Sequence, residues 1–498
     1  MNRSVFVRMA LVVSVAVVGL SVAGCLGKES IFANRAYPPS TIQWRVLTAI
    51  QNPSPLNKGQ LQILDARYDI RNAENGLIPS FFISGYSGSL PSVILNYPEQ
   101  ETGYVYGYGD GSLAAVNYAN EQKGGSISGL VPNLPPGSFY VTQDGKYGFA
   151  ANQPAQYLTV VDRVAGITVN LNLPNVYKVA VNPSGSVAMA YVQNSNYAYR
   201  VIHLQQPNGT IAPVPTFPNE NNWPKAVSPV DCQPVNTPFY CVVPVLDQNG
   251  NPIQFNRPNN AVFSSDGTTA WLLNCGPECG GTAPASVSFL NTGVLDIYNF
   301  PGSTYPTPPQ NPPPPTVSAT VPVPGGATMA LYGNGTLYVS GQQLQSDGLF
   351  EGFLSVINLG TMQVTNTYPI ADGTHTKMLF GDDNTLWIGS QLCQMGERTA
   401  NPSLGTNGCL TLFNMNNNSV LVEPWYGDLT GLCSITGWHK MYTAYGGQIH
   451  IYATTNSGIT TWTTTPYQAG TELDNYNVTV TGTAFDVAYM DALSNAAD

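Results

Sequence analysis

The segment "VTQDGKYGFAANQPAQYLTVVD", residues 141 to 162, decides the fold of this chain of 498 residues. It predicts three strands, with a tight turn at Asp144-Gly145, because Asp-Gly between alternating apolar residues favours a hairpin. The pattern recurs with turns anchored at Gly103, Gly145, Gly185, Gly267, Gly335, Asn384 and Gly447. The first intervals are 42 residues (145 − 103) and 40 residues (185 − 145). A period near 40 with four short strands per unit is typical of β-propeller blades.

The later strands of the repeat carry a family motif. Within residues 335 to 370, "GTLYVSG" and "FLSVINLGTMQVTNTYPI" predict the second, third and fourth strands of one blade. These motifs resemble the YVTN-type bacterial β-propellers, and "YLTVVDRVAGITVNLNL" is a looser copy. The resemblance spans most of residues 90 to 490. It implies a fold that is shared by proteins of differing function, including lactonase-like and quinoprotein-like propellers.

Both ends of the chain carry strands that lack partners in a blade. "TAFDVAYMD" (483 to 491) predicts an innermost strand with no strands after it, and "IQWRVLTAI", "QLQILDARYDI" and "PSFFISGY" predict three strands with no innermost strand before them. Pairing the two ends would close the ring and leave only short, protected edges. We therefore predict one all-β propeller over residues 42 to 498, with eight four-stranded blades, and seven as the alternative.

The N-terminus resembles a bacterial lipoprotein signal. Arg3 and Arg8 precede the apolar stretch "ALVVSVAVVGL", which is shorter than the roughly 20 residues that span a bilayer. "VAGC" (22 to 25) resembles a lipobox, which implies that residues 1 to 24 are removed, that Cys25 carries acyl chains such as palmitate, and that 25 to 41 form a tether. Leu26 stands where Asp would retain a lipoprotein at the inner membrane, so we expect an anchor in the outer membrane. An ordinary secretory signal is the alternative.

Composition limits the partners of the protein. Charged residues make up 9%, whereas Gly (49), Pro (40) and Tyr (28) are abundant, as expected for a turn-rich β-protein outside the cytoplasm. The net charge of −11 argues against nucleic acid, because phosphate binding needs a basic surface. The partners that we expect are the membrane, through the lipid, and an anionic ligand, a glycan or an envelope protein.

Long loops are predicted on one face, which we call the top face, where the second strand of each blade leads into the third and the fourth strand leads into the next blade. They include an insertion at about 216 to 257, and the Pro-rich loop 301 to 316 is an exception on the opposite face. The seven cysteines after Cys25 all fall in the predicted top-face loops, where disulfides would hold irregular chain in an oxidising compartment. By proximity we predict the pairs Cys393–Cys409, Cys232–Cys241 and Cys275–Cys279, with Cys433 left over. A metal site at "CGPEC" is the alternative, but we predict no metal site.

Three lysines share one position of the repeat, seven residues before the turn anchor: Lys178, Lys377 and Lys440. Here the innermost strand is predicted to begin, so their ammonium groups would ring the mouth of the central channel. Their neighbours complete the predicted site: Tyr177, His375 and His439. A ring of cations would attract carboxylate or phosphate. The alternative is that each lysine packs its stem between blades and leaves its head in water.

Three tryptophans in predicted top-face loops could stack against sugars or a protein partner: Trp223, Trp425 and Trp438. Enzyme motifs are missing from the sequence, which has no C-x-x-C-H, G-x-S-x-G or H-E-x-x-H. The sequence leaves any cofactor unknown, and no residue is predicted to be catalytic. We expect a non-catalytic binding or scaffold module of the envelope. The competing hypothesis is a lactonase-type hydrolase or a quinoprotein-type oxidoreductase with its centre at the same channel mouth.

Overall fold

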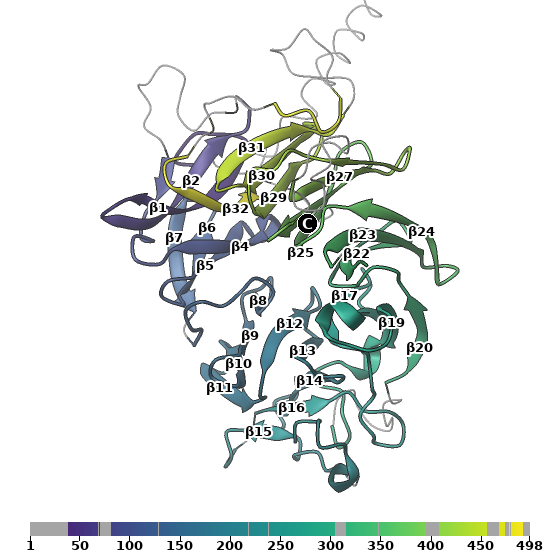
Figure 1. The fold of residues 1–498 in the computed structure, drawn as a ribbon. Helices are drawn as coiled ribbons and strands as arrows, with labels where there is room; N and C mark the ends of the chain where they lie inside the picture. Colours follow the sequence, from purple (N-terminus) through teal and green to yellow (C-terminus); the bar gives the residue numbers. More distant parts are fainter. Residues whose placement is uncertain are drawn as a thin grey trace, which may run out of the picture.

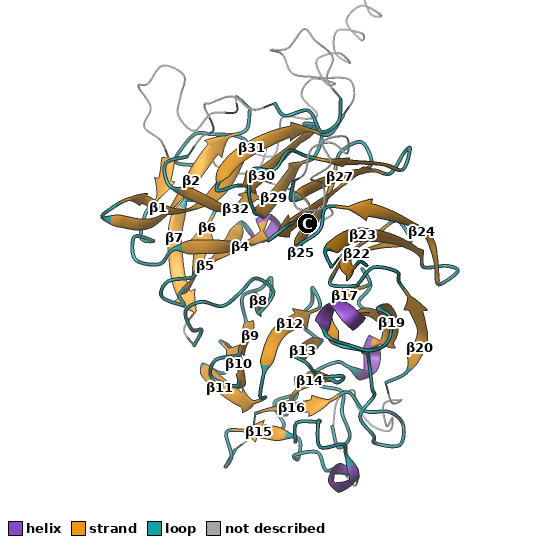
Figure 2. Cartoon of the chain, in the orientation of Figure 1, coloured by secondary structure: helices purple, strands orange, loops and turns teal. Residues whose placement is uncertain are grey.

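The chain folds into an eight-bladed β-propeller (Figure 1). The computed structural model describes residues 38–491 except 68, 70–80, 128, 218, 238, 304–314, 347, 395–407, 456–467, 474–477 and 479. Within this part the strands form eight antiparallel sheets (Figure 2), and helix is limited to four short 3-10 segments: η1 (Pro98–Gln100), η2 (Glu220–Asn222), η3 (Gly276–Cys279) and η4 (Thr292–Val294). No helix of the described residues is long and apolar enough to cross a membrane. The predicted signal peptide and Cys25 lie outside the described residues.

Blades 1 to 4 follow the chain, each with its innermost strand first. Blade 1 contains β4 (Pro91–Tyr97), β5 (Thr102–Gly107), β6 (Leu113–Asn117) and β7 (Gln122–Ile127). Blade 2 contains β8 (Phe139–Val141), β9 (Tyr147–Asn152), β10 (Tyr157–Asp162) and β11 (Ile167–Asn172). Blade 3 contains β12 (Val176–Val181), β13 (Ala188–Val192), β14 (Ala198–His203), β16 (Tyr240–Pro244) and β15 (Asp231–Gln233). Blade 4 contains β17 (Pro258–Phe263), β18 (Thr269–Asn274), β19 (Ser286–Asn291) and β20 (Val317–Pro322).

Blades 5 to 8 complete the ring. Blade 5 contains β21 (Met329–Gly333), β22 (Thr336–Leu344), β23 (Phe350–Asn358) and β24 (Gln363–Ile370). Blade 6 contains β25 (Thr374–Gly381), β26 (Thr385–Gln391), β27 (Leu410–Asn414) and β28 (Ser419–Val422). Blade 7 contains β29 (Leu429–Ile435), β30 (Lys440–Tyr445) and β31 (Gln448–Ala453). Blade 8 contains β32 (Thr483–Tyr489), β1 (Arg45–Ser54), β2 (Asn57–Asp65) and β3 (Phe81–Ile83).

Blade 8 closes the ring by joining the two ends of the chain, as predicted. The yellow strand β32 lies beside the purple strand β1 in Figure 1, and the two pair in antiparallel register from Val46↔Tyr489 onward. A buried ion pair follows the last paired residues, with Arg45 Nη2 2.7 Å from Asp491 Oδ1. Each face of a blade packs its apolar side chains against the next blade, and Leu158, for example, shares one buried cluster with residues of blade 3. The ring is therefore held by interfaces between blades.

Blade 3 explains the interval of 82 residues (267 − 185) between two turn anchors. The intervening chain forms β15 and β16, the two outer strands of this blade, so no extra blade lies there. The connection between β14 and β15 starts on the bottom face, because a third strand ends opposite the face at which its innermost strand begins. The predicted top-face insertion at 216 to 257 is thus wrong in part, and only the residues after β16 lead back to the top face. The Pro-rich loop joins β19 to β20, but its residues 304–314 lie outside the described residues.

Blade 7 differs from the prediction by one strand. The hairpin around Gly447 was expected to contain the innermost and second strands, but it contains β30 and β31, the second and third. The innermost strand is β29, which the sequence analysis had placed in a top-face loop. The turn between β29 and β30 includes Gly437, which has a φ of 81° that favours glycine. This shift moves several predicted site residues to the opposite face of the propeller.

Candidate functional site

A pocket of about 670 Å³ lies at the top-face mouth of the channel, and we call it the mouth pocket. Its lining comes from the loops and strand ends of blades 1, 6, 7 and 8 and from the loop that enters blade 2. The polar side chains in this lining include Gln51, Asn133, Gln391, Asp428 and Thr430. Pockets of 300–1,000 Å³ that bring together a few polar groups are the usual sites for small ligands. The mouth pocket is therefore the candidate functional site.

An ion pair between two innermost strands lies at the mouth pocket. Lys377 of β25, which lines the pocket, donates from Nζ to both carboxylate oxygens of Asp486 of β32, at 3.0 and 3.1 Å. Asp486 also accepts from the backbone N–H groups of Ile94 and Val487. Its side chain is only 2% exposed, and burial raises the pKa of this carboxyl group while the Lys377 charge lowers it. The charge of Lys377 is thus compensated within the protein.

Glycine makes this contact between blades 6 and 8 possible. The innermost strand β29 of blade 7 lies between β25 and β32, so Lys377 has to reach past it. At Gly431 of β29, a Cβ atom would lie 2.7 Å from Asp486 Oδ1 and 2.8 Å from the Asp486 Cα. Such distances are too short for real Cβ atoms. The absence of a side chain at position 431 therefore lets Asp486 occupy the place where Lys377 meets it.

Two exposed aromatic side chains line the mouth pocket, and two further exposed apolar residues are next to lining residues in the sequence. Tyr108 and Tyr426 line it and are 41% and 43% exposed. Trp425, the neighbour of Tyr426 in sequence, is 65% exposed, and Leu392, the neighbour of Gln391, is 75% exposed. Large apolar groups that remain in water at one opening mark a surface for binding. We call these four side chains the aromatic rim.

Contacts with His450 and Glu472 fix the Tyr426 ring. It stacks on the His450 imidazole, with ring centroids 4.6 Å apart, and its hydroxyl donates to Glu472 Oε2 at 3.0 Å. His450 Nδ1 in turn lies 2.5 Å from Glu472 Oε1, and this contact is the first cause that lowers the pKa of Glu472. Nearby Glu423 is buried, and burial raises the pKa of its carboxyl group to about 7. These contacts hold the Tyr426 ring in place at the pocket.

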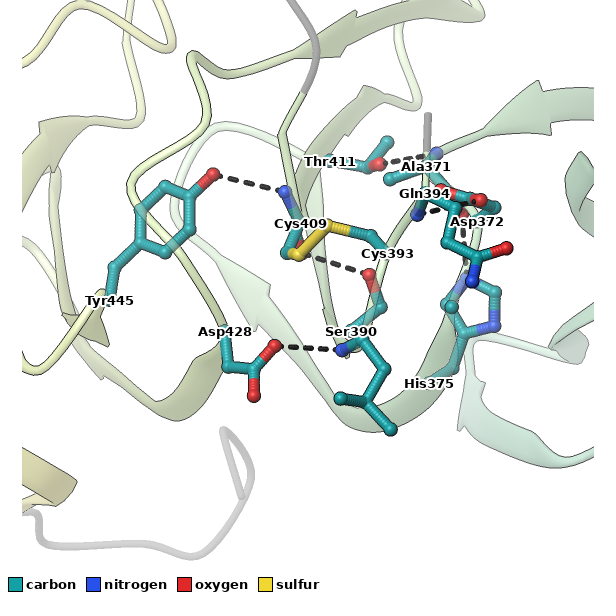
Figure 3. Close-up of a disulfide and its surroundings, with 12 residues drawn as sticks. Ala371, Asp372, His375, Ser390, Cys393, Gln394, Cys409, Thr411, Asp428 and Tyr445 are labelled. Atoms are coloured by element: carbon teal, nitrogen blue, oxygen red, sulfur yellow. Dashed lines mark hydrogen bonds between the residues drawn. A yellow bond between two sulfur atoms is a disulfide. The ribbon is translucent and has the colours of Figure 1, made fainter. Parts of the chain in front are cut away.

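The Cys393–Cys409 disulfide supports the loops beside the pocket (Figure 3). The N–H of Leu392 donates to Asp428 Oδ1 at 2.7 Å, which joins the end of β26 to the loop before β29. The N–H of Cys409 donates to the hydroxyl of Tyr445, which itself donates to the carbonyl of Pro424. The residues between the two cysteines, 395–407, lie outside the described residues. The disulfide joins the two ends of the β26–β27 connection in blade 6, and these hydrogen bonds connect those ends to the loop that carries Trp425 and Tyr426.

All three predicted disulfides are present, but they do not all lie on the top face. Cys275–Cys279 encloses η3, in the top-face connection between β18 and β19. Cys232–Cys241 instead joins the outer strands β15 and β16, where the two residues are direct cross-strand partners. Cys433 is buried on β29. The prediction that all seven cysteines lie in top-face loops is therefore wrong.

The three predicted lysines do not converge. Lys440 begins β30 and pairs across the turn with Ile435, at the bottom end of β29, where its Nζ lies 2.5 Å from Asp69 Oδ2. The two residues before it lie at the same end of the propeller. Trp438 packs on Trp44, and His439 Nδ1 lies 2.6 Å from Asp383 Oδ2. The prediction of a site at the channel mouth is thus wrong for Lys440 and His439, and Trp438 lies in the bottom-face turn between β29 and β30, not in a top-face loop. The reason is the shift of one strand in blade 7.

The remaining predicted residues lie on the expected blades. Lys178 and Tyr177 are half-buried on the innermost strand β12, and Lys377 lines the mouth pocket. His375 is buried on β25 with Nε2 3.0 Å from the carbonyl of Ala371, and burial lowers its pKa to about 4, so the ring is neutral. Trp223 is half-buried and donates to the carbonyl of Gly250, which gives it a packing role. Tyr108, Tyr426 and Asp486 were not predicted from the sequence, although Asp486 is the one charged residue within the apolar strand "TAFDVAY".

No protein-family model and no curated protein sequence matches the chain. Among solved structures, a dihydro-heme d1 dehydrogenase in complex with DHE aligns at 13% identity and a TM-score of 0.48, over 92% of this chain and 79% of that chain. A periplasmic gluconolactonase from Pseudomonas aeruginosa aligns at 13% identity and a TM-score of 0.39, over 91% and 99%. A β-propeller domain from Myceliophteria thermophila aligns at 11% identity and a TM-score of 0.40, over 75% and 97%. Likeness at this level says nothing about what this chain binds or catalyses.

Proposed function

We propose that this protein is an envelope lipoprotein whose propeller binds a neutral, polyhydroxylated ligand, such as an oligosaccharide fragment, in the mouth pocket. The observation that carries the proposal is the aromatic rim beside a pocket lined by amide and hydroxyl groups. Side-chain amides both donate and accept hydrogen bonds, which suits hydroxyl groups. Aromatic rings offer flat apolar faces for stacking. Glycans were among the partners expected from the sequence.

Charge compensation favours a neutral ligand over the anionic one expected from the lysine register. Lys377 is the lysine that lines the mouth pocket, and Asp486 already accepts from its ammonium group. An anion would have to compete with that carboxylate, and the lining also contains the acidic side chain of Asp428. Binding of a neutral ligand should therefore change little with salt, because salt screens charge–charge attraction.

Anchoring through Cys25 is the second part of the proposal, and the basic and apolar N-terminal segment that ends in "VAGC" supports it. A lipid-anchored propeller would present its top face to soluble or wall-bound ligands. The long chain between the anchor and the first strand, residues 25 to 41 of the predicted tether, would separate the pocket from the membrane surface. The multiple acyl chains of a bacterial lipoprotein would hold it firmly, whereas one chain gives marginal binding.

Calorimetric titration of the purified soluble propeller with chitotriose and maltotriose tests the binding proposal. We expect Tyr108→Ala and Gln391→Ala each to weaken binding of the better ligand by about tenfold, the effect of roughly 1.4 kcal/mol. Phe82→Ala is the matched control, because Phe82 is 48% exposed on β3 but does not line the pocket. Unchanged affinity in both pocket variants, or a strong preference for a carboxylated sugar that fades with salt, would contradict the proposal.

The same protein also tests the competing hypothesis of an enzyme. Hydrolysis of a sugar lactone, or quinone-dependent reduction of a dye, should be absent if the pocket only binds. Activity in the wild type that is lost in Tyr108→Ala but retained in Phe82→Ala would place a catalytic centre at the mouth pocket. It would then favour the hydrolase or oxidoreductase over the binding module.

A further inference from the structure

Gln51 is a buried polar residue in the lining of the mouth pocket. It lies near the top-face end of β1, where it pairs with Thr483 of β32, and it is only 8% exposed. Its Nε2 donates to the backbone carbonyls of Leu90 and Pro91 in blade 1, both at 3.2 Å. Because carbonyl groups only accept, these two contacts settle which atom of the amide is the nitrogen and which is the oxygen.

The amide oxygen of Gln51 is left without a partner. Oε1 accepts from no group in the part of the chain that the structure describes. It also differs from the fully enclosed polar atoms that lack a partner, such as Gln62 Nε2 on the neighbouring strand β2, because it is accessible from outside. The space next to Gln51 is the mouth pocket, so a group that enters the pocket can reach this oxygen.

Gln206 shows the complete set of contacts for a glutamine of this kind. It is buried, and its Nε2 donates to the carbonyls of His203 and Leu204. Its Oε1 also accepts from the Ser303 hydroxyl at 2.8 Å. Gln51 has the two contacts of the nitrogen and lacks the contact of the oxygen. A structural tie between strands therefore accounts for the amide nitrogen of Gln51 but not for its oxygen.

Other polar groups of the lining also offer acceptors rather than donors. The Thr430 hydroxyl donates to the carbonyl of Ala444 at 3.3 Å, which leaves its oxygen free to accept. The carboxylate of Asp428 adds oxygens that only accept. The ammonium group of Lys377 already donates to both oxygens of Asp486. A ligand that fits this set has to donate hydrogen bonds, and hydroxyl groups are the neutral donors of a polyhydroxylated ligand.

We propose that Gln51 determines the specificity of the mouth pocket, because its Oε1 accepts a hydrogen bond from an unsubstituted hydroxyl group of the ligand. This inference rests on the proposed function, since it needs a ligand in the pocket. A ligand with hydrogen or a methyl ether in place of that hydroxyl group has no proton to donate. Binding of such a ligand leaves Gln51 Oε1 without a partner, and this is how polar sites reject close analogues.

Calorimetric titration with monodeoxy and mono-O-methyl analogues of a trisaccharide tests the proposal. The parent is chitotriose or maltotriose, whichever binds the wild type better. We expect analogues modified at one position to bind the wild type about tenfold more weakly than the parent, the effect of one lost hydrogen bond. In Gln51→Met the parent should also bind about tenfold more weakly, and the same analogues should lose no further affinity. The two changes then fail to add, because they remove the same hydrogen bond.

Gln206→Met is the matched control, since Gln206 has the same contacts of the amide nitrogen but lies outside the pocket lining. It should leave the discrimination against the analogues unchanged. Equal affinity of the wild type for the parent and every analogue would overturn the inference without any variant. Analogue losses that are as large in Gln51→Met as in the wild type would overturn it as well, and both results leave the proposed function intact. Binding of neither trisaccharide to the wild type would instead overturn the proposed function and this inference with it.

Discussion

Replacing Lys377 by methionine removes the counter-ion of Asp486 and keeps most of the side-chain volume. In Lys377→Met, the carboxyl group still accepts from the N–H groups of Ile94 and Val487, but it has no cation beside it. Breaking a buried ion pair by removal of one partner costs about 3–5 kcal/mol. Lys377 is 26% exposed, and Asp486 can take up a proton, so we expect a smaller loss at neutral pH, of about 2–3 kcal/mol.

The pH dependence of this loss has a definite sign. The folded-state pKa of Asp486 is already raised by burial, and removal of the Lys377 charge raises it further. Below the unfolded pKa of about 3.9 the group is protonated in both states and the variant loses little. As pH rises above that value, the unfolded chain ionises first, so the free energy of unfolding of the variant falls relative to wild type. The deficit should be small at pH 4 and larger at pH 7.5.

Differential scanning calorimetry at pH 4 and pH 7.5 measures this effect. A folded ring of this length has an unfolding entropy near 1 kcal/mol per degree, so the deficit at pH 7.5 corresponds to a fall in Tm of roughly 2–3 °C. Lys146→Met is the control. Both side chains of the Lys146–Asp144 pair are exposed, so loss of this pair should leave Tm unchanged at both pH values. A Tm difference for Lys377→Met that is the same at pH 4 and pH 7.5 would refute the reasoning.

Three further outcomes are expected. Gly431→Ala should lower Tm by a degree or more, because its Cβ would clash with Asp486 backbone and overpacking costs about 1–3 kcal/mol, and an unchanged melting curve would contradict this contact. The double variant Cys393→Ser/Cys409→Ser should lose about 3 kcal/mol of stability, because the disulfide no longer closes the loop between these residues. It should also bind ligand more weakly at the mouth pocket. Scanning calorimetry would measure the first effect and titration calorimetry the second. Cys25→Ser should release the protein from membranes and abolish labelling by a fatty-acid probe, and persistent labelling would refute the lipobox.

The sequence predicted the ring because its evidence is local and repeated. Each Gly-anchored turn joins two strands that are neighbours along the chain, and the unpaired strands at the two ends leave one blade to complete. The same local evidence explains the error in blade 7. A hairpin such as the one at Gly447 shows that two strands pair, but not whether they are the first and second or the second and third of a blade. The alternation of Leu429, Cys433 and Ile435 ahead of Gly437 was the signal for the missing innermost strand.

The candidate site could be predicted only in outline. Lys377 and Lys178 were identified because repeats place equivalent residues at equivalent positions. The partner of Lys377 was not, since Asp486 approaches Lys377 from a strand 109 residues away, past a blade that lies between them. Such contacts depend on how the ring closes, and no spacing within one repeat encodes them. The aromatic rim could not be predicted from the sequence either, because Tyr108 and Tyr426 differ from the many buried tyrosines only in their surroundings.

The buried charges near the channel also bear on function. The chain has only 18 basic residues, and a charge held away from water costs free energy unless a partner compensates it. A buried ion pair such as Lys377–Asp486 is seldom better for stability than a well-packed apolar pair. Stability alone therefore does not account for Lys377, which lines the mouth pocket where a ligand that enters from the top face would meet it.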